Sequence, residues 1–483
     1  MPFPWPITAW QIHPASFIPA ELLAVCRLVL ALLVSIHVLR NKRDIGAAIG
    51  WIGLAWIAPL TGGLLYALFG VNRVRRLARR MRPPRGDAPP AEVATPAGDG
   101  TESHLAALDH AGWRLTRRHR VTDNDVRILE NGDAAYPSML AALHAANNSI
   151  ALTTYILTDD QAGGPFVDAL IAAHQRGVAV RVLLDGIGSG YFRAPAFGRL
   201  RRNGVPAAQF MHSPLPWRMP FLNLRTHKKI LVVDGTSAFT GGMNINAANV
   251  LATHPKHPVR DIHFAITGPV VGQLLAAFAN DWLFATGETL HGATWFPNQA
   301  PSGEMVARVV TSGPDKDLEH IEYMILQAVA CARTTVEIMT PYFLPAERLV
   351  TALALAALRG VRVDVLVPQH SNHVVTDWAA RANNPPMLKA GVNIWQNPPP
   401  FDHSKLMVVD GLWCFIGSAN WDTRSFRLNF EVNVEVCDAS LAGALSSIMA
   451  ARRGARVTQS TLDARGPAIE LRDAATRLLL PYL

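Results

Sequence analysis

One stretch of this chain occurs twice, and the repetition limits the folds that the chain can adopt. The first copy begins at His227 and the second at His403. Counted from the histidine, both copies have Lys at position +2, Asp at +7, Gly at +14 and Asn at +17. Only seven of the 45 Lys and Arg residues are Lys, yet Lys229 and Lys405 occupy the same place in the two copies. Such a match indicates an internal duplication whose parts share one chemical task.

Each copy predicts a β-hairpin. The apolar run 230–233 and its counterpart in the second copy are each followed by Asp-Gly, the strongest short-range hairpin signal. If the Asp-Gly pair forms a two-residue turn, His227 lies opposite Gly242, and His403 lies opposite Ser418. Because side chains alternate along a strand, four residues of each copy then share one face.

These shared faces suit the binding of a tetrahedral anion. Each offers an imidazole, an ammonium and an amide beside a small residue. In contrast, Asp234 and Asp410 fall on the turns, with the opposite parity from the histidines, which favours a structural role for them. The two predicted faces consist of His227, Lys229, Gly242 and Asn244 in the first copy, and of His403, Lys405, Ser418 and Asn420 in the second.

The duplication extends beyond the hairpins. A predicted strand, helix and strand over 149–157, 166–175 and 176–185 recur in the same order over 336–342, 348–358 and 359–368. This alternation is typical of an α/β fold. We therefore expect two α/β halves, 105–300 and 301–483, whose half-sites meet at a pseudo-twofold interface.

The region before residue 105 predicts a membrane segment, 1–82, and a linker. Residues 45–72 contain no charged side chain and exceed the roughly 20 residues that cross a bilayer. Residues 17–39 are also apolar, so we expect two spanning helices. Seven Arg residues follow between 73 and 85, and by the positive-inside rule they place the rest of the chain in the cytoplasm. Residues 83–104, rich in Pro, Ala and Gly, read as a disordered linker.

The composition favours an anionic partner. The net charge is +8 and the isoelectric point is near 9.6, which suits either nucleic acid or an anionic lipid surface. The four Cys residues show no paired spacing, which argues against a disulfide framework and a zinc site. His254, His257 and His263 lie close in sequence, but their spacing is not that of a regular metal-ligand set.

With these motifs in view, the chain resembles the phospholipase D superfamily, and within it the bacterial cardiolipin synthases. The resemblance rests on the duplicated motif, on Arg260-Asp261-Ile-His263 and on 424–431. It implies two sandwich-like α/β halves with one shared active site. It also implies a catalytic set that needs no metal or other cofactor and consists of His227, Lys229, Asp234, His403, Lys405 and Asp410.

The residues and the resemblance together suggest double-displacement phosphoryl transfer. One histidine attacks phosphorus, and the other protonates the leaving alkoxide and later deprotonates the incoming alcohol. By analogy with the family, His227 is the nucleophile and His403 the acid and base, although the symmetry of the sequence cannot establish this order. We expect Asp261 to support His227, and Glu431 to support His403, by holding the far ring nitrogen.

The function implied by the resemblance is cardiolipin synthesis from two molecules of phosphatidylglycerol. Its partners would be anionic phospholipids and a membrane, not nucleic acid, and its location would be the bacterial inner membrane, as a multi-pass protein with a cytoplasmic catalytic portion. Three alternatives stay open from the residues: a phospholipase D that uses water or another alcohol, a nuclease of the superfamily, and a membrane scaffold with a relic site. The apolar N-terminal runs argue against the nuclease, and the two complete motifs argue against the relic.

Overall fold

The computed structural model describes residues 20–42, 45–70, 103–213 and 224–478. The chain separates into two compact units, Met1–Leu77 and Ala78–Leu483. The arginine cluster after residue 72 lies outside the described residues, as does the predicted linker except for its last two positions.

The N-terminal unit contains α1 (Ala20–Asn41), α2 (Ile45–Ile57), α3 (Pro59–Leu65) and the π-helical turn η1 (Tyr66–Gly70). Of the described residues, the stretch Glu21–Asn41 is the one helix long and apolar enough to cross a membrane.

The predicted second span is divided in two. Helix α2 ends before Ala58, whose φ of −137° is not helical, and Pro59 begins α3. Proline disfavours the helical conformation in the residue before it and has no N–H to donate. With 13 and 7 residues, α2 and α3 are each shorter than a span of roughly 20 residues. The expectation of two spanning helices, and with it a multi-pass topology, is therefore not supported.

The second unit carries the duplicated α/β pattern. Its first part consists of η2 (Ser103–Leu105), α5 (Ala106–Thr116), β1 (Val121–Glu130), α6 (Asn131–Ala145), β2 (Ser149–Thr154), α7 (Gly163–Gln175), β3 (Ala179–Asp185), α8 (Pro195–Arg202), β4 (Ala207–Phe210), β5 (Arg225–Thr226), β6 (Ile230–Val233), β7 (Ser237–Gly241), η4 (Ala247–Asn249), η5 (Leu251–Thr253), β8 (Val259–Arg260), β9 (Ile262–Thr267) and α9 (Val270–Thr286).

The second part repeats this order with additions at its end. It consists of β10 (Met305–Ser312), α10 (His320–Cys331), β11 (Thr335–Met339), β12 (Phe343–Leu344), α11 (Glu347–Leu358), β13 (Arg362–Pro368), α12 (Val374–Asn383), α13 (Pro385–Lys389), β14 (Asn393–Asn397), β15 (Phe401–Asp402), β16 (Leu406–Val409), β17 (Trp413–Gly417), β18 (Trp421–Asp422), α14 (Thr423–Arg427), β19 (Asn429–Cys437), α15 (Ala439–Ala451), β20 (Arg456–Val457), α16 (Gln459–Asp463) and α17 (Pro467–Arg477).

One sheet of 16 strands runs through both parts. Read outward from the central pair β1 and β10, the strands of the two parts follow in equivalent order. On one side the order is β9-β7-β6-β2-β3-β4, and on the other it is β19-β17-β16-β11-β13-β14. In each part three strands are parallel and the motif hairpin joins them antiparallel. This equivalent order is the structural counterpart of the repeated sequence, so the predicted duplicated α/β fold is confirmed.

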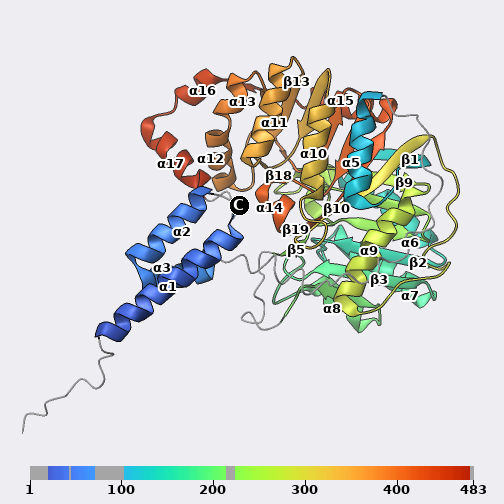
Figure 1. The fold of residues 1–483 in the computed structure, drawn as a ribbon. Coiled ribbons are helices and arrows are strands. Elements are labelled where there is room, and N and C mark those ends of the chain that lie inside the picture. The colour runs from blue at the N-terminus through green and yellow to red at the C-terminus, as the bar shows by residue number, and fades with distance from the viewer. Residues whose placement is uncertain (1–19, 43–44, 71–102, 214–223, 479–483) are drawn as a thin grey trace, which may run out of the picture. The chain divides into compact units, whose positions relative to one another are not determined.

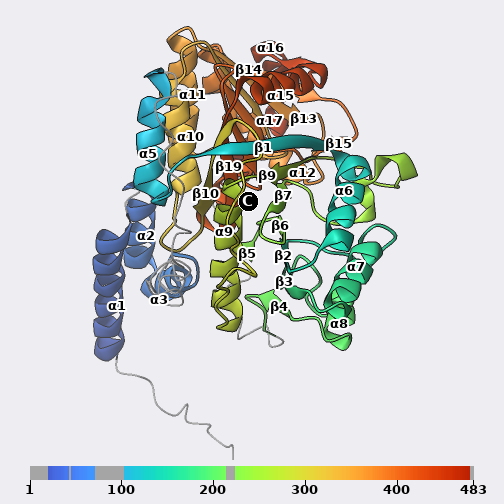
Figure 2. The same cartoon turned by 90° about the vertical axis from the view of Figure 1, so that its right-hand side faces the viewer.

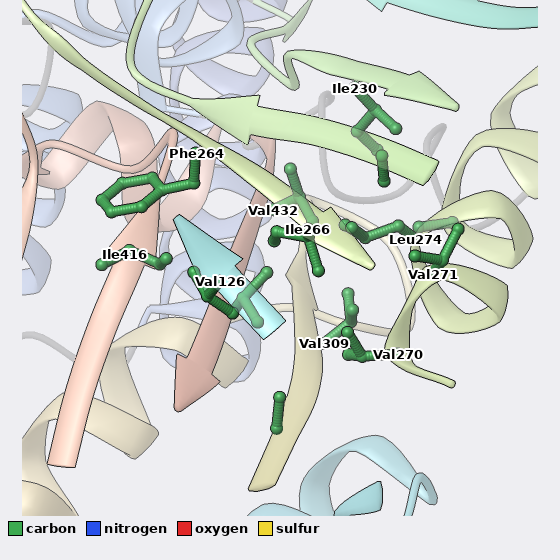
Figure 3. Close-up of a cluster of buried hydrophobic side chains, with 14 of the residues drawn as sticks. Val126, Ile230, Phe264, Ile266, Val270, Val271, Leu274, Val309, Ile416 and Val432 are labelled. Atoms are coloured by element: carbon green, nitrogen blue, oxygen red, sulfur yellow. The ribbon is translucent and has the colours of Figure 1, made fainter. Parts of the chain in front are cut away.

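Helices cover both faces of the sheet. Helices α6, α7 and α8 pack on one face in the first part, and α5, α10 and α11 in the second (Figures 1 and 2). The opposite faces meet α9 and α15 in a shared central core, of which Figure 3 shows ten labelled side chains. Along β6, Ile230 and Val232 enter this central core, while Leu231 and Val233 face the helices outside. Burial on both faces explains why the motif strands are uninterrupted apolar runs.

The motif hairpins form, but their register differs by one residue from the prediction. Asp234 and Gly235 do occupy the turn, with φ of 52° and 66°. However, Thr236 also belongs to the loop, so that Val233 pairs with Ser237. In the second hairpin Leu412 is the corresponding extra residue. The predicted pairing of His227 with Gly242, and of His403 with Ser418, is therefore wrong.

Candidate active site

Each motif histidine is positioned by a strand from the other part of the chain. Strand β5, which leads into His227, pairs parallel with the start of β19, and the His227 N–H donates to the Phe430 carbonyl at 2.9 Å. Strand β15, which leads into His403, pairs parallel with β8, and the His403 N–H donates to the Arg260 carbonyl at 2.8 Å. The residue after each accepting carbonyl is a carboxylic acid, Glu431 in one case and Asp261 in the other.

The carboxylates consequently support the histidines in crossed pairs. Nδ1 of His227 lies 3.1 Å from Oε2 of Glu431 and 3.1 Å from the Ser418 carbonyl oxygen. Nδ1 of His403 lies 2.9 Å from Oδ2 of Asp261. The prediction that each carboxylate supports the histidine of its own half is wrong, because the short strands before the histidines cross to the opposite half.

The crossed pairs bring the two imidazoles face to edge. Their ring centroids are 6.5 Å apart and the ring planes are inclined by 79°. With both Nδ1 atoms engaged by carboxylates, each Nε2 atom is the nitrogen available to a substrate. Burial lowers the pKa of His227, and burial together with the Lys405 charge holds the pKa of His403 well below its usual value. Both shifts favour the neutral form of the imidazole.

The two motif lysines are also buried beside the histidines. Nζ of Lys229 donates to the His227 carbonyl oxygen at 2.7 Å, and Nζ of Lys405 donates to the His403 carbonyl oxygen. Burial lowers the pKa of Lys229 to about 7 and that of Lys405 to about 8. Burial disfavours the charged form of each ammonium, and the nearby carboxylates compensate only in part. A bound anion would favour the charged form.

Each motif asparagine has a buried side-chain oxygen that the protein leaves unsatisfied. The side-chain oxygens of Asn244 and Asn420 are buried and have no hydrogen-bond partner in the described structure. Buried polar atoms are nearly always paired, and exceptions gather at functional sites. The Asn244 backbone is fixed by the Tyr136 hydroxyl, which donates to its carbonyl oxygen at 2.8 Å.

The small residues of the two copies create unlike environments for the carboxylates. Ser418 Oγ donates to Glu431 Oε2 at 2.5 Å, and Asn429 donates to the other carboxylate oxygen at 3.1 Å. At Gly242 a Cβ atom would lie only 2.5 Å from Oδ1 of Asp261, so a side chain is excluded there. Burial raises the pKa of Asp261 to about 7. Burial also acts to raise the pKa of Glu431, but its interactions with His227, Lys229 and Ser418 outweigh burial and hold that pKa below its usual value.

Asp234 and Asp410 lie at the far ends of the hairpins and stabilise the turns. Asp234 accepts hydrogen bonds from the backbone N–H groups of Asn148 and Ser149 at 2.6 and 2.9 Å. Asp410 likewise accepts from those of Thr334 and Thr335 at 2.8 and 2.9 Å. The resemblance groups these two aspartates with the catalytic residues, whereas their carboxylates bind backbone amides at the opposite end of each hairpin from the histidine.

Two tyrosines that the motifs do not contain also border the site. The Tyr155 ring lies 5.3 Å from the His227 ring, and Nζ of Lys229 lies 5.6 Å from the Tyr155 ring centroid. The Tyr342 ring lies 6.3 Å from that of His403. Each tyrosine follows shortly after a parallel strand, and the carboxyl ends of such strands are where α/β folds place their sites. That position was the signal in the sequence that could have identified them.

One further observation concerns metal binding. Within residues 20–42, 45–70, 103–213 and 224–478, no three His, Cys, Asp or Glu side chains gather as a metal-binding group.

Comparison with known proteins agrees with this geometry. A family model described as cardiolipin synthase, phospholipase D-like domain, matches residues 139–282 and 325–452. The major cardiolipin synthase of Bacillus subtilis is 30% identical over 97% of this chain and 99% of its own length. Cardiolipin synthase A of Pseudomonas aeruginosa is 33% identical over 88% of this chain and 87% of its own.

A solved structure supports the fold alone. The crystal structure of phosphatidylserine synthase from Haemophilus influenzae superposes with a TM-score of 0.60 at 14% identity, and it covers 78% of this chain and 100% of that one.

The duplicated hairpins, the crossed histidine–carboxylate pairs and the sequence matches over most of the chain lead to one assignment. The chain belongs to the family of phospholipase D-like cardiolipin synthases.

Proposed function

We propose that this protein is a cardiolipin synthase that transfers a phosphatidyl group from one phosphatidylglycerol to the terminal hydroxyl of a second and releases glycerol. The observation that carries the proposal is the pair of buried imidazoles, 6.5 Å apart, each held at Nδ1 by a carboxylate and each with Nε2 available. The relatives named as cardiolipin synthases give the substrate class.

The proposed reaction has two displacements at one phosphorus. In the first, Nε2 of His227 forms a bond to phosphorus while the bond to the glycerol oxygen breaks, and His403 gives that oxygen a proton. In the second, His403 takes a proton from the hydroxyl of the acceptor lipid, whose oxygen displaces His227. Atoms and charges balance because the proton lost in the first step is recovered in the second.

The unlike carboxylates support this assignment of roles. Glu431 is held as an anion by Ser418 and Asn429, so it stabilises the positive charge that His227 acquires on bonding to phosphorus. Asp261, with its pKa raised to about 7, is better suited to share a proton with His403. The negative phosphodiester would raise the pKa of His403 on binding and thus prepare it as the acid.

The lysines and asparagines are proposed to hold the non-bridging oxygens. Lys229 and Lys405 supply positive charge, and the side-chain amide nitrogens of Asn244 and Asn420 are the proposed neutral donors to the phosphate oxygens. Charge stabilisation of this kind can be supplied by side chains in a water-poor pocket. Product formation is therefore expected to continue in excess EDTA.

The proposed setting is a bacterial inner membrane. Helix α1 is the proposed anchor, and anionic phospholipids, not nucleic acid, are the proposed partners. The seven Arg residues after position 72 favour a cytoplasmic catalytic portion.

The test uses the purified full chain in detergent with labelled phosphatidylglycerol. Cardiolipin and glycerol in equal amounts are the expected products. Phosphatidic acid as the main product would instead identify a hydrolase, because water would then be the acceptor. His227→Ala and His403→Ala are expected to lose product by several orders of magnitude, since such groups act as a unit. A variant that retains a tenth of the activity would contradict the shared site.

A further inference from the structure

The strand topology places two loops at the edge of the active site. Strands β2 and β3 are parallel, and so are β11 and β13, so the residues after each pair lie at one edge of the sheet. Tyr155 and Tyr342, which follow β2 and β11, lie against the motif histidines. The segments that follow β3 and β13 therefore border the same site. Residues 186–194 are named here the first rim loop, and residues 369–374 the second rim loop.

The first rim loop is fixed to the site by two groups. Asp185 accepts hydrogen bonds from the N–H groups of Ile187 and Gly188, both at 2.9 Å, and with its other oxygen it accepts from Thr226, next to His227, also at 2.9 Å. Ser189 Oγ donates to the Tyr155 carbonyl oxygen at 3.1 Å. The same carboxylate thus holds both the loop and the strand that leads into the histidine.

The tip of this fixed loop presents an aromatic side chain to solvent. Phe192 is 83% exposed, although its ring also contacts that of Tyr191 at a centroid distance of 4.5 Å. A single exposed apolar residue is ordinary on a protein surface. Here, however, a large aromatic group stands on an anchored loop at the rim of a buried site.

The second rim loop has a similar arrangement. The Tyr342 hydroxyl donates to Oδ1 of Asn372 at 2.6 Å, so the loop is fixed to the ring that borders His403. Val374, at its end, is 56% exposed. Each half therefore offers one exposed apolar side chain beside the tyrosine that packs on its motif histidine.

The charge around the first rim loop suits an anionic surface. Arg193 follows Phe192 in the loop and is exposed. An apolar tip beside an arginine suits the interface of an anionic bilayer.

We propose that the two rim loops insert Phe192 and Val374 into the interfacial layer of an anionic phospholipid bilayer, which brings lipid headgroups to the histidines. This inference rests on the proposed function. The histidines are largely buried, with His227 only 8% exposed, while the diacylglycerol part of the substrate remains in the membrane. The rim must therefore touch the bilayer if a headgroup is to reach Nε2.

The kinetic test compares two substrates for the full chain. One is phosphatidylglycerol with short acyl chains, used below its micelle concentration, and the other is long-chain phosphatidylglycerol in mixed micelles. For Phe192→Ser and for the double variant with Val374→Ser, the ratio of long-chain to short-chain kcat/KM is expected to fall at least fivefold. Leu358→Ser is the matched control, because Leu358 is 69% exposed on α11 and belongs to neither loop. An unchanged ratio would overturn the proposal.

A binding measurement keeps this test separate from catalysis. Tryptophan is introduced as Phe192→Trp or, as the control, as Leu358→Trp, and its quenching by vesicles of brominated phosphatidylglycerol is compared with wild type. Extra quenching is expected for Phe192→Trp alone. Equal quenching of the two variants would contradict insertion. If wild type formed no cardiolipin, the proposed function would fail, and the quenching would still decide whether the rim loops enter the bilayer.

Discussion

The carboxylate of Glu431 lies 3.1 Å from Nδ1 of His227, although 204 residues separate them along the chain. The reciprocal contact joins Asp261 to His403 at 2.9 Å across 142 residues. Each motif histidine is thus oriented by a carboxylate from the opposite half. The chemistry of either half depends on the correct docking of the other.

The crossed pairs predict distinct defects for the two carboxylates. Glu431→Gln removes the anion that supports His227, so formation of the phosphohistidine should slow by about 10²-fold or more. A rapid quench with labelled phosphatidylglycerol, followed by peptide mapping, should place an acid-labile adduct on the peptide that carries His227. Asp261→Asn should instead slow both formation and breakdown of the adduct, most strongly for a poor leaving group. A label found only on the peptide that carries His403 would reverse the roles.

The small residues predict different effects at the two corresponding positions. Gly242→Ala should lower activity at least about tenfold, because its Cβ would meet Oδ1 of Asp261 at 2.5 Å and displace that carboxylate from His403. Ser418→Ala should be milder. It removes a hydrogen bond that lowers the pKa of Glu431, so that pKa should rise and the acid limb of the kcat/KM profile should move to higher pH. An unaffected Gly242→Ala variant would contradict the close contact.

The buried lysines predict an alkaline limit. Burial lowers the pKa of Lys229 to about 7 and that of Lys405 to about 8, so each ammonium loses its proton, and its hold on phosphate, as the pH rises through these values. In the free enzyme kcat/KM should therefore fall as the pH rises above about 7, whereas kcat should hold to higher pH because the bound phosphate raises both pKa values. Lys229→Arg keeps its charge, so its residual activity should show a weaker alkaline decline. If Lys229→Arg and Lys405→Arg both showed the same alkaline decline as wild type, these two lysines would be excluded as its cause.

The turn aspartates predict a loss of stability without a specific loss of chemistry. Asp234→Ala should lower the free energy of unfolding by about 1–3 kcal/mol, because backbone N–H groups of 147–149 lose their acceptor. The measurement is thermal unfolding in detergent, with Asp234→Asn as the milder control, since its amide oxygen still accepts. At temperatures where the variant stays folded, the amount of phosphohistidine adduct should match wild type. Loss of the adduct in the folded variant would restore Asp234 to the catalytic set.

Much of the fold follows from periodicity that the sequence displays openly. The repeated apolar runs ending in Asp-Gly predict the motif hairpins, and the alternating strand and helix patterns around 149–185 predict β2, α7 and β3. The hairpin register could not be predicted from the sequence. Thr236 and Leu412 belong to the loops and not to the strands, and neither residue type indicates this.

The candidate site was only partly predictable, because spacing along the chain does not show which strands pair. Spacing along the chain puts Asp261 near His227 and Glu431 near His403, but it says nothing of short strands that cross between halves. The interruption of the second apolar run was foreseeable from Pro59, whose effect on Ala58 is local. The division of a long apolar run into two short helices shows that hydropathy alone does not establish a span.

The pairing of β5 with β19 and of β15 with β8 has a consequence for the ancestry of the protein. A half-length forerunner would have held a histidine and a carboxylate that could not reach each other within one molecule. It could have been active only as a homodimer in which the carboxylate of each subunit contacted the histidine of the other. Fusion of the two genes would then have freed the copies to diverge, and the exchange of a glycine for a serine at one of the two equivalent positions is the trace that such divergence would leave.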